Sequence, residues 1–102
     1  MKETIQRRPA HHPRTASRVF SGEAVIITPA DNVIRMLNPT GSRIWELADG
    51  SRTVDEIVDV LVDEYDVDFT RAQQTTRDLL SELDEKGLIA WNARNPGIKI
   101  PG

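Results

Sequence analysis

The sequence predicts an α+β domain in which a three-stranded antiparallel sheet precedes three helices. Short β-branched runs separated by turn residues occupy residues 18–37, and such runs are typical of strands. Helix start signals then recur three times between residues 38 and 73. A chain of 102 residues with 38% apolar content fits one domain with a modest core. Three short helices beside a small sheet form the winged helix-turn-helix pattern, here with the sheet placed first.

The sheet is predicted from three short segments. Residues 18–21 form the first strand, and a Gly-Glu turn leads into a β-branched run over residues 24–28. Proline, aspartate and asparagine in residues 29–32 provide the next turn, and residues 33–37 form the third strand. Because so small a sheet is marginal alone, we expect one of its faces to pack on the helices.

Each helix begins with a capping signal. Asn38 precedes Pro39, which puts an N-cap before a proline in the first helical position. Thr53 with Glu56 forms a capping box, and apolar residues recur behind it at helical spacing. Thr70, followed three residues later by glutamine, predicts a second capping box at the start of the third helix. The apolar stripe of that helix is predicted to be Ala72, Thr76, Leu79, Leu80 and Leu83, with Gly87 as its stop.

The two ends of the chain differ in composition from its centre. Residues 1–17 carry prolines, adjacent histidines and few apolar side chains, so they predict a flexible basic arm. Residues 92–102 predict a loose C-terminal tail. The folded domain is accordingly expected to span residues 18–91.

The composition argues against several function classes. The chain has no cysteine, which excludes thiolate metal sites and cysteine nucleophiles, and no apolar run of roughly eighteen residues that would predict a membrane span. His11 and His12 lack a third ligand, so no metal site is predicted. Neither a glycine-rich phosphate loop nor a serine-nucleophile motif is present. We therefore expect no cofactor, no enzymatic activity and a cytoplasmic location.

Charge is divided unevenly along the chain. Residues 1–20 are basic, whereas residues 53–68 carry Asp and Glu with neither Lys nor Arg. This pattern suits an electrostatic partner contact or a solvated helix face. A winged-helix DNA-binding regulator is the alternative that the helix pattern permits, but an acidic second helix would repel phosphates. We therefore expect neither nucleic acid nor a membrane as a partner.

One stretch resembles a known family. Residues 37–61, LNPTGSRIWELADGSRTVDEIVDVL, combine an Asn-Pro-Thr-Gly helix start, Trp45, an Asp-Gly stop and a Thr-initiated capping box. Followed by a helix and by the GLI of residues 87–89, this stretch resembles the PqqD-like family, the RiPP recognition element that includes coenzyme PQQ synthesis protein D. The resemblance extends over residues 18–91.

The resemblance implies a non-catalytic peptide chaperone. Members of the family bind the leader of a ribosomally made precursor peptide and present it to a modifying enzyme, often a radical SAM enzyme. The leader adds as a strand beside the third strand, in the groove with the third helix, and so satisfies unpaired edge groups. Carried over to this chain, the implied peptide-binding residues are Val33, Ile34, Arg35, Met36 and Leu37 on the strand and Arg71, Thr75, Asp78 and Leu79 on the helix.

Arg35 and Arg71 would suit an acidic leader. The resemblance leaves open whether the product is PQQ or another modified peptide, and the sequence leaves open which flank of the third helix faces the groove. A free sheet edge also allows a homodimer.

Overall fold

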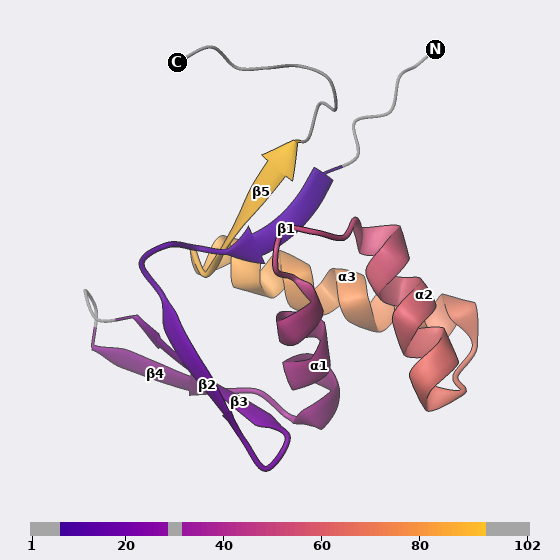
Figure 1. Ribbon diagram of the computed structural model, residues 1–102, viewed down its shortest axis with the longest axis horizontal. Coiled ribbons are helices and arrows are strands. Elements are labelled where there is room, and N and C mark those ends of the chain that lie inside the picture. Colours follow the sequence, from indigo (N-terminus) through magenta and orange to yellow (C-terminus); the bar gives the residue numbers. More distant parts are fainter. Residues whose placement is uncertain (1–6, 29–31, 94–102) are drawn as a thin grey trace.

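The structure is a computed structural model that describes residues 7–28 and 32–93 (Figure 1). The predicted α+β arrangement is confirmed, because a three-stranded antiparallel sheet precedes three helices. Two further strands, near the two ends of the chain, form a second small sheet. The strands are β1 (Arg7–His11), β2 (Ala16–Phe20), β3 (Glu23–Thr28), β4 (Val33–Met36) and β5 (Ile89–Ala93), and the helices are α1 (Pro39–Leu47), α2 (Val54–Tyr65) and α3 (Phe69–Glu85).

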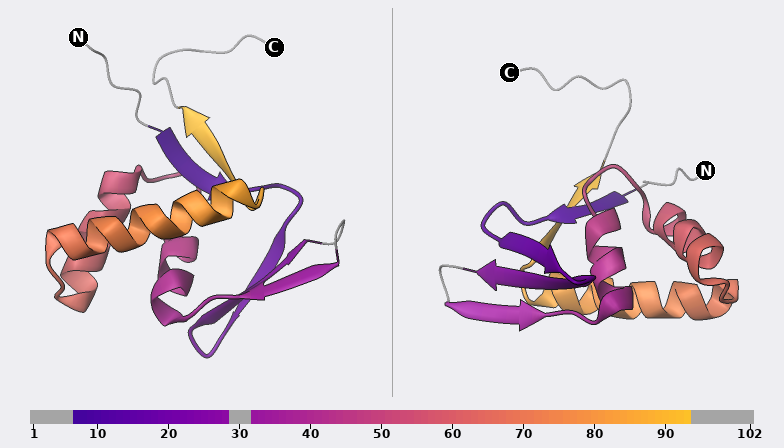
Figure 2. Two further views of the ribbon diagram at one scale, coloured as in Figure 1. Left: turned by 180° about the vertical axis from the view of Figure 1, so that it is seen from behind. Right: turned by 60° about the horizontal axis from the view of Figure 1, so that its bottom comes forward.

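The three-stranded sheet has the order β2-β3-β4 and is antiparallel throughout. Its register pairs Val25 with Met36 and Ile26 with Arg35. α1 packs against β3, whose Ala24 and Ile26 are completely buried. Figure 2 shows α1 between this sheet and α2, with α3 running past α1 toward β5. The helices thus cover one face of the sheet.

Capping side chains fix the first two helix starts as predicted. The Asn38 side chain accepts a hydrogen bond from the Gly41 N–H at 2.7 Å, with proline in the first helical position. The Thr53 hydroxyl accepts from the Glu56 N–H while the Glu56 carboxylate accepts from the Thr53 N–H, which completes the capping box. Both caps satisfy backbone donors that a helix start leaves unpaired.

The capping box predicted at Thr70 is wrong. α3 begins at Phe69, two residues before the start that an N-cap at Thr70 implies, and its N-cap is Asp68, whose carboxylate accepts from the Arg71 N–H at 2.8 Å. An ionised aspartate both caps the helix and complements its positive N-terminal dipole, so it outcompetes a threonine placed two residues later. None of the helices in residues 7–28 and 32–93 combines the length and the apolar character that crossing a membrane requires.

Trp45 connects α1 to both sheets. Its side chain is 1% exposed, and its ring stacks on His11 of β1 with the ring centroids 3.7 Å apart and the planes at 7°. The indole N–H donates to Ser17 Oγ on β2 at 3.0 Å, and His11 Nε2 donates to the Trp45 carbonyl at 2.7 Å. The core around it is formed by Ala24, Ile26, Ile44, Leu47, Ala48, Ile57, Val58, Leu61, Ala72, Leu80, Leu83, Leu88 and Ile89.

β1 corrects the prediction of a flexible arm over residues 1–17. Residues Arg7–His11 pair with β5, and the Gly50 N–H donates to the Pro9 carbonyl at 2.9 Å. The composition of residues 7–11 does not indicate a strand, because proline is rare in strands other than those at a sheet edge. The residues that pair with this strand are also remote in the sequence. Asn92 and Ala93, expected in a loose tail, also belong to β5. The remainder of both expected ends, residues 1–6 and 94–102, lies outside the described residues.

Gly50→Ala is expected to destabilise the fold more than Gly22→Ala. Both glycines have a positive φ, +91° and +80° respectively, so an alanine is strained at either position. Only at Gly50 would the new methyl group meet neighbours, Asn92 Nδ2 at 3.1 Å and Ala10 Cβ at 3.4 Å. Urea unfolding should show a loss of about 1–2 kcal/mol for Gly22→Ala and a larger loss for Gly50→Ala. Equal losses would contradict a tight contact between this loop and the β1–β5 sheet.

Candidate functional site

β4 lies at an open edge of the three-stranded sheet (Figure 1). It pairs with β3 on one side, and no strand in the described ranges pairs with its other side. The sheet edge predicted at residues 33–37 is therefore present. The strand itself ends at Met36, but the Leu37 N–H continues the pairing by donating to the Ala24 carbonyl at 2.9 Å. Such an edge presents backbone N–H and C=O groups that a further strand can bind.

Alternation along β4 decides which backbone groups face the open side. In an antiparallel pair, successive residues direct their N–H and C=O groups toward and away from the partner strand in turn. Because Leu37 bonds to β3, Arg35 and Val33 also face β3. Ile34 and Met36 consequently present their backbone groups to the open side, and an added strand would bond there.

The side chains of β4 alternate between the two faces of the sheet. Arg35 pairs with the buried Ile26 and therefore lies on the face that meets the helices. Arg35 is half-buried, and its Nε is shielded from solvent without a hydrogen-bond partner among the described residues. Ile34 and Met36 lie on the opposite face, each 67% exposed. The edge thus offers a cation on its helix side and apolar side chains on its outer side.

Ser42 fixes the end of β4 to the start of α1. Its hydroxyl accepts a hydrogen bond from the Ala24 N–H at 2.6 Å and donates to the Leu37 carbonyl at 3.1 Å. Ala24 and Leu37 face one another at the end of the β3–β4 ladder, so the hydroxyl takes the place of a direct backbone bond. Ser42 is 2% exposed, and the position of β4 relative to the helices is therefore set by a buried contact.

A cavity of about 420 Å³ opens where β4 ends. It lies between the start of α1, the end of α2 and the first turns of α3, and it has an apolar wall and a polar rim. Two of the residues predicted on the third helix, Arg71 and Thr75, contribute to it. The lining residues are Asn38, Thr40, Leu61, Tyr65, Val67, Arg71, Ala72 and Thr75.

The other two residues predicted on α3, Leu79 and Asp78, lie on different sides of the helix. Leu79 is half-buried against the core. It lies close to Leu37, because a methyl group placed at Gly41 would be 3.5 Å from Leu79 Cδ2 and 3.6 Å from Leu37 Cβ. Asp78 is not brought to the cavity, and its carboxylate instead accepts from Gln74 Nε2 at 2.9 Å on the exposed side of the helix. The flank that meets β4 and α1 therefore carries Arg71, Thr75 and Leu79.

Four cavity residues were not anticipated from the sequence: Asn38, Thr40, Tyr65 and Val67. Asn38 and Thr40 come just after the predicted strand, where the sequence indicates the start of a helix and no binding role. Tyr65 is 42% and Val67 37% exposed, and both fall outside the apolar stripe of α2. Large apolar side chains that the core does not need are the signal that could have identified them.

An ion pair joins two of the three helices that border this cavity. Arg43 on α1 donates to both carboxylate oxygens of Glu64 on α2, at 2.8 and 2.6 Å. This hydrogen bonding holds the pKa of Glu64 below its usual value, and the same contact raises the pKa of Arg43. Because the carboxylate pKa is lowered, the pair contributes its full stability above the ordinary pKa of glutamate. That contribution is lost as the pH falls through the lowered value.

The fold and the site define a small α+β module with an open sheet edge beside a helix flank, the geometry used for strand addition. Comparison with known families identifies it further. The model of the family described as coenzyme PQQ synthesis protein D matches residues 23–89, so the chain belongs to the PqqD family. This confirms the resemblance found in the sequence.

Two solved structures are similar to the chain. One is TbiB1 in complex with the TbiA(beta) leader peptide, which is 30% identical with a TM-score of 0.73 over 78% of this chain and 93% of that chain. The other is a lasso peptide synthetase B1 complexed with the leader peptide, which is 20% identical with a TM-score of 0.71 over 83% of this chain and 98% of that chain. The second likeness concerns the fold alone. None of the curated proteins matches the sequence.

Ser42→Ala is expected to lower the free energy of unfolding by about 1–3 kcal/mol, because it leaves the buried Ala24 N–H without an acceptor. The matched control is Ser81→Ala on the exposed surface of α3, where a change within about 0.5 kcal/mol is expected. Urea unfolding of both variants measures the difference. A Ser42→Ala protein as stable as the control would show that the hydroxyl bridge does not hold β4.

Proposed function

We propose that this chain is an adaptor that binds the leader segment of a ribosomally made precursor peptide and presents it to a modifying enzyme. The observation that carries the proposal is the open edge of β4, where Ile34 and Met36 direct their backbone groups away from β3. Membership of the PqqD family and the likeness to leader-bound TbiB1 support it.

Strand addition would allow the chain to bind leaders of different sequence. Backbone hydrogen bonds to Ile34 and Met36 supply affinity without regard to side chains, and alternate leader side chains provide specificity. Those on the helix side would lie near Arg35, Leu37 and Leu79 and extend toward the cavity. Those on the outer side would lie beside the exposed side chains of β4.

An acidic leader suits the helix side of the edge. The Arg35 Nε has no hydrogen-bond partner in the described part of the chain, and a shielded donor on a charged group is costly to leave unpaired. A leader carboxylate or carbonyl would satisfy it. Arg71, on the rim of the cavity, would add a second, more exposed cation for the same peptide.

The charge distribution favours a peptide over DNA. Exposed carboxylates on α2 and its C-terminal end would repel a phosphate backbone: Asp55, Glu56, Asp59, Asp63, Glu64 and Asp66. The adaptor role requires no chemistry from the chain itself, and the reaction belongs to the enzyme that receives the peptide. A radical SAM enzyme is the partner class that the family resemblance suggests, and a second copy of the chain would compete with the leader for the open edge of β4.

Ile34→Pro is expected to weaken leader binding without unfolding the domain. Proline removes an N–H that faces the open side, and a sheet edge tolerates such a residue. Titration with a leader peptide that the natural chain binds should show affinity reduced about tenfold or more, since a hydrogen bond and close approach are lost together. Ile34→Ala, which keeps the N–H, is the control and should bind nearly as well as the natural chain.

If Ile34→Pro fails to fold, a leader N-methylated at alternate positions tests the same contacts from the other side. One methylation register should weaken binding and the other should not. Equal binding by both methylated leaders would contradict strand addition.

Arg35→Gln and Arg71→Gln are each expected to weaken binding of an acidic leader, Arg35→Gln by roughly tenfold and Arg71→Gln by a few-fold. The difference follows from burial, because charge-assisted hydrogen bonds contribute more when shielded from solvent. Calorimetric titration measures both. Arg77→Gln, on the other flank of α3, is the matched control with unchanged affinity, and a loss equal to that of Arg35→Gln would place the leader elsewhere.

A further inference from the structure

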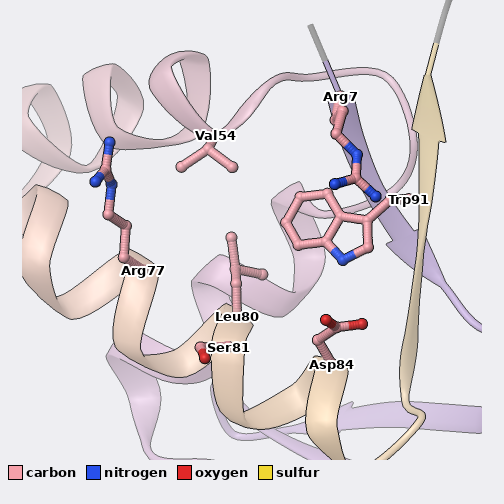
Figure 3. A pocket seen from close by; sticks show the side chains of 7 residues that line it. All are labelled: Arg7, Val54, Arg77, Leu80, Ser81, Asp84 and Trp91. Carbon is pink, nitrogen blue, oxygen red and sulfur yellow. The ribbon is translucent and has the colours of Figure 1, made fainter. Parts of the chain in front are cut away.

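A second cavity, of about 380 Å³, lies on the far side of α3 from the open edge of β4. Figure 3 shows two guanidinium groups, those of Arg7 and Arg77, on opposite sides of the apolar side chains of Val54 and Leu80. Trp91 forms the remaining apolar wall. The full lining is Arg7, Val54, Arg77, Leu80, Ser81, Asp84 and Trp91.

The two arginines are held apart from acidic partners. The Arg7 guanidinium lies over the Trp91 ring, 5.2 Å from its centroid, a cation–π contact that positions the group and leaves its N–H donors accessible. Neither Arg7 nor Arg77 forms an ion pair with any described residue. Asp84 is the single carboxylate in the lining. The cavity therefore combines a net positive rim with an apolar floor.

This cavity and the leader edge are on opposite flanks of one helix. Residues 77, 80 and 84 follow helical spacing along one side of α3, and residues 71, 75 and 79 follow it along the other. Both sites can therefore be occupied at once. Two of the cavity residues, Arg7 and Trp91, lie outside residues 23–89, which match the family, because the cavity is completed by the β1–β5 sheet.

We infer that this cavity is a docking site for the modifying enzyme, and that it binds an acidic segment in which an aromatic or branched aliphatic side chain precedes carboxylates. The apolar side chain fits the floor made by Val54, Leu80 and Trp91, and the carboxylates meet the two guanidinium groups. Charge-assisted hydrogen bonds from arginine suit carboxylates in a forked geometry. The identity of the enzyme as occupant rests on the proposed adaptor function.

The chemistry of the cavity argues against other occupants. A polyanion such as nucleic acid would extend beyond the two arginines over a chain of net charge −3, whereas a short acidic segment needs only the two arginines. The proposed site for the leader peptide is the backbone edge of β4, whereas this cavity would select its occupant through the side chains that line it. A volume near 380 Å³ admits one large side chain with its neighbours and is at the lower end of sites that bind small molecules.

The test uses the peptide acetyl-Phe-Glu-Glu-amide as probe and acetyl-Phe-Gln-Gln-amide as its uncharged match. The readout is the indole N–H NMR signal of Trp91, and the indole N–H of Trp45, which is bound to Ser17, is the internal reference. At millimolar concentrations, the acidic probe should shift the Trp91 signal, whereas the uncharged match should leave it in place. Arg7→Gln with Arg77→Gln should reduce the affinity about tenfold or more, and Arg14→Gln, in an exposed turn, should not.

A second measurement uses the full chain with the modifying enzyme that receives its leader peptide. The double variant is expected to bind the enzyme more weakly while the leader still shifts the β4 amides as in the natural chain. A shift of Trp91 by both probes, no shift by either, or undiminished affinity in the double variant would overturn the inference. Loss of the leader response at β4 would instead count against the proposed function, so the two failures are distinguishable.

Discussion

The buried hydroxyl of Ser42 is the contact on which the arrangement of the site depends. It occupies the last rung of the β3–β4 ladder, where it connects the Ala24 N–H with the Leu37 carbonyl. The first turn of α1 is thereby locked into the sheet, and β4 is held at a fixed distance from the helices. A short edge strand on its own would fray, whereas this one is anchored at the end nearest the cavity.

The molecule has two separate surfaces, one on each flank of α3. On one flank of α3, Arg71 and Leu79 lie toward the end of β4 and the start of α1. On the other flank, Arg77 and Leu80 line a cavity that Arg7 and Trp91 of the β1–β5 sheet complete. An adaptor must hold a peptide and a second protein together, and α3 separates two surfaces that suit these tasks. The β1–β5 sheet contributes the second surface and also packs on Trp45 through His11.

Much of the fold could be predicted from local signals. The caps at Asn38 and Thr53, the β-branched runs and the free edge at β4 are properties of short segments, and the structure confirms them. The strand β1 could not be predicted, because its partner β5 is remote in sequence and its residues, RRPAH, include no β-branched side chain. The prediction for the start of α3 is wrong because two residues that can cap a helix, Asp68 and Thr70, lie within three positions. The sequence does not show that Tyr65 and Val67 line one cavity, because they meet its other residues only when α2 and α3 pack side by side.

Amide hydrogen exchange with and without the leader shows whether a partner strand bonds to the open side of β4. The amides of Ile34 and Met36 should exchange rapidly in the free chain and become protected when the leader is added. The amide of Leu37, already bonded to Ala24, should change little. Protection confined to other elements, with Ile34 and Met36 still exchanging freely at saturating leader, would contradict the account.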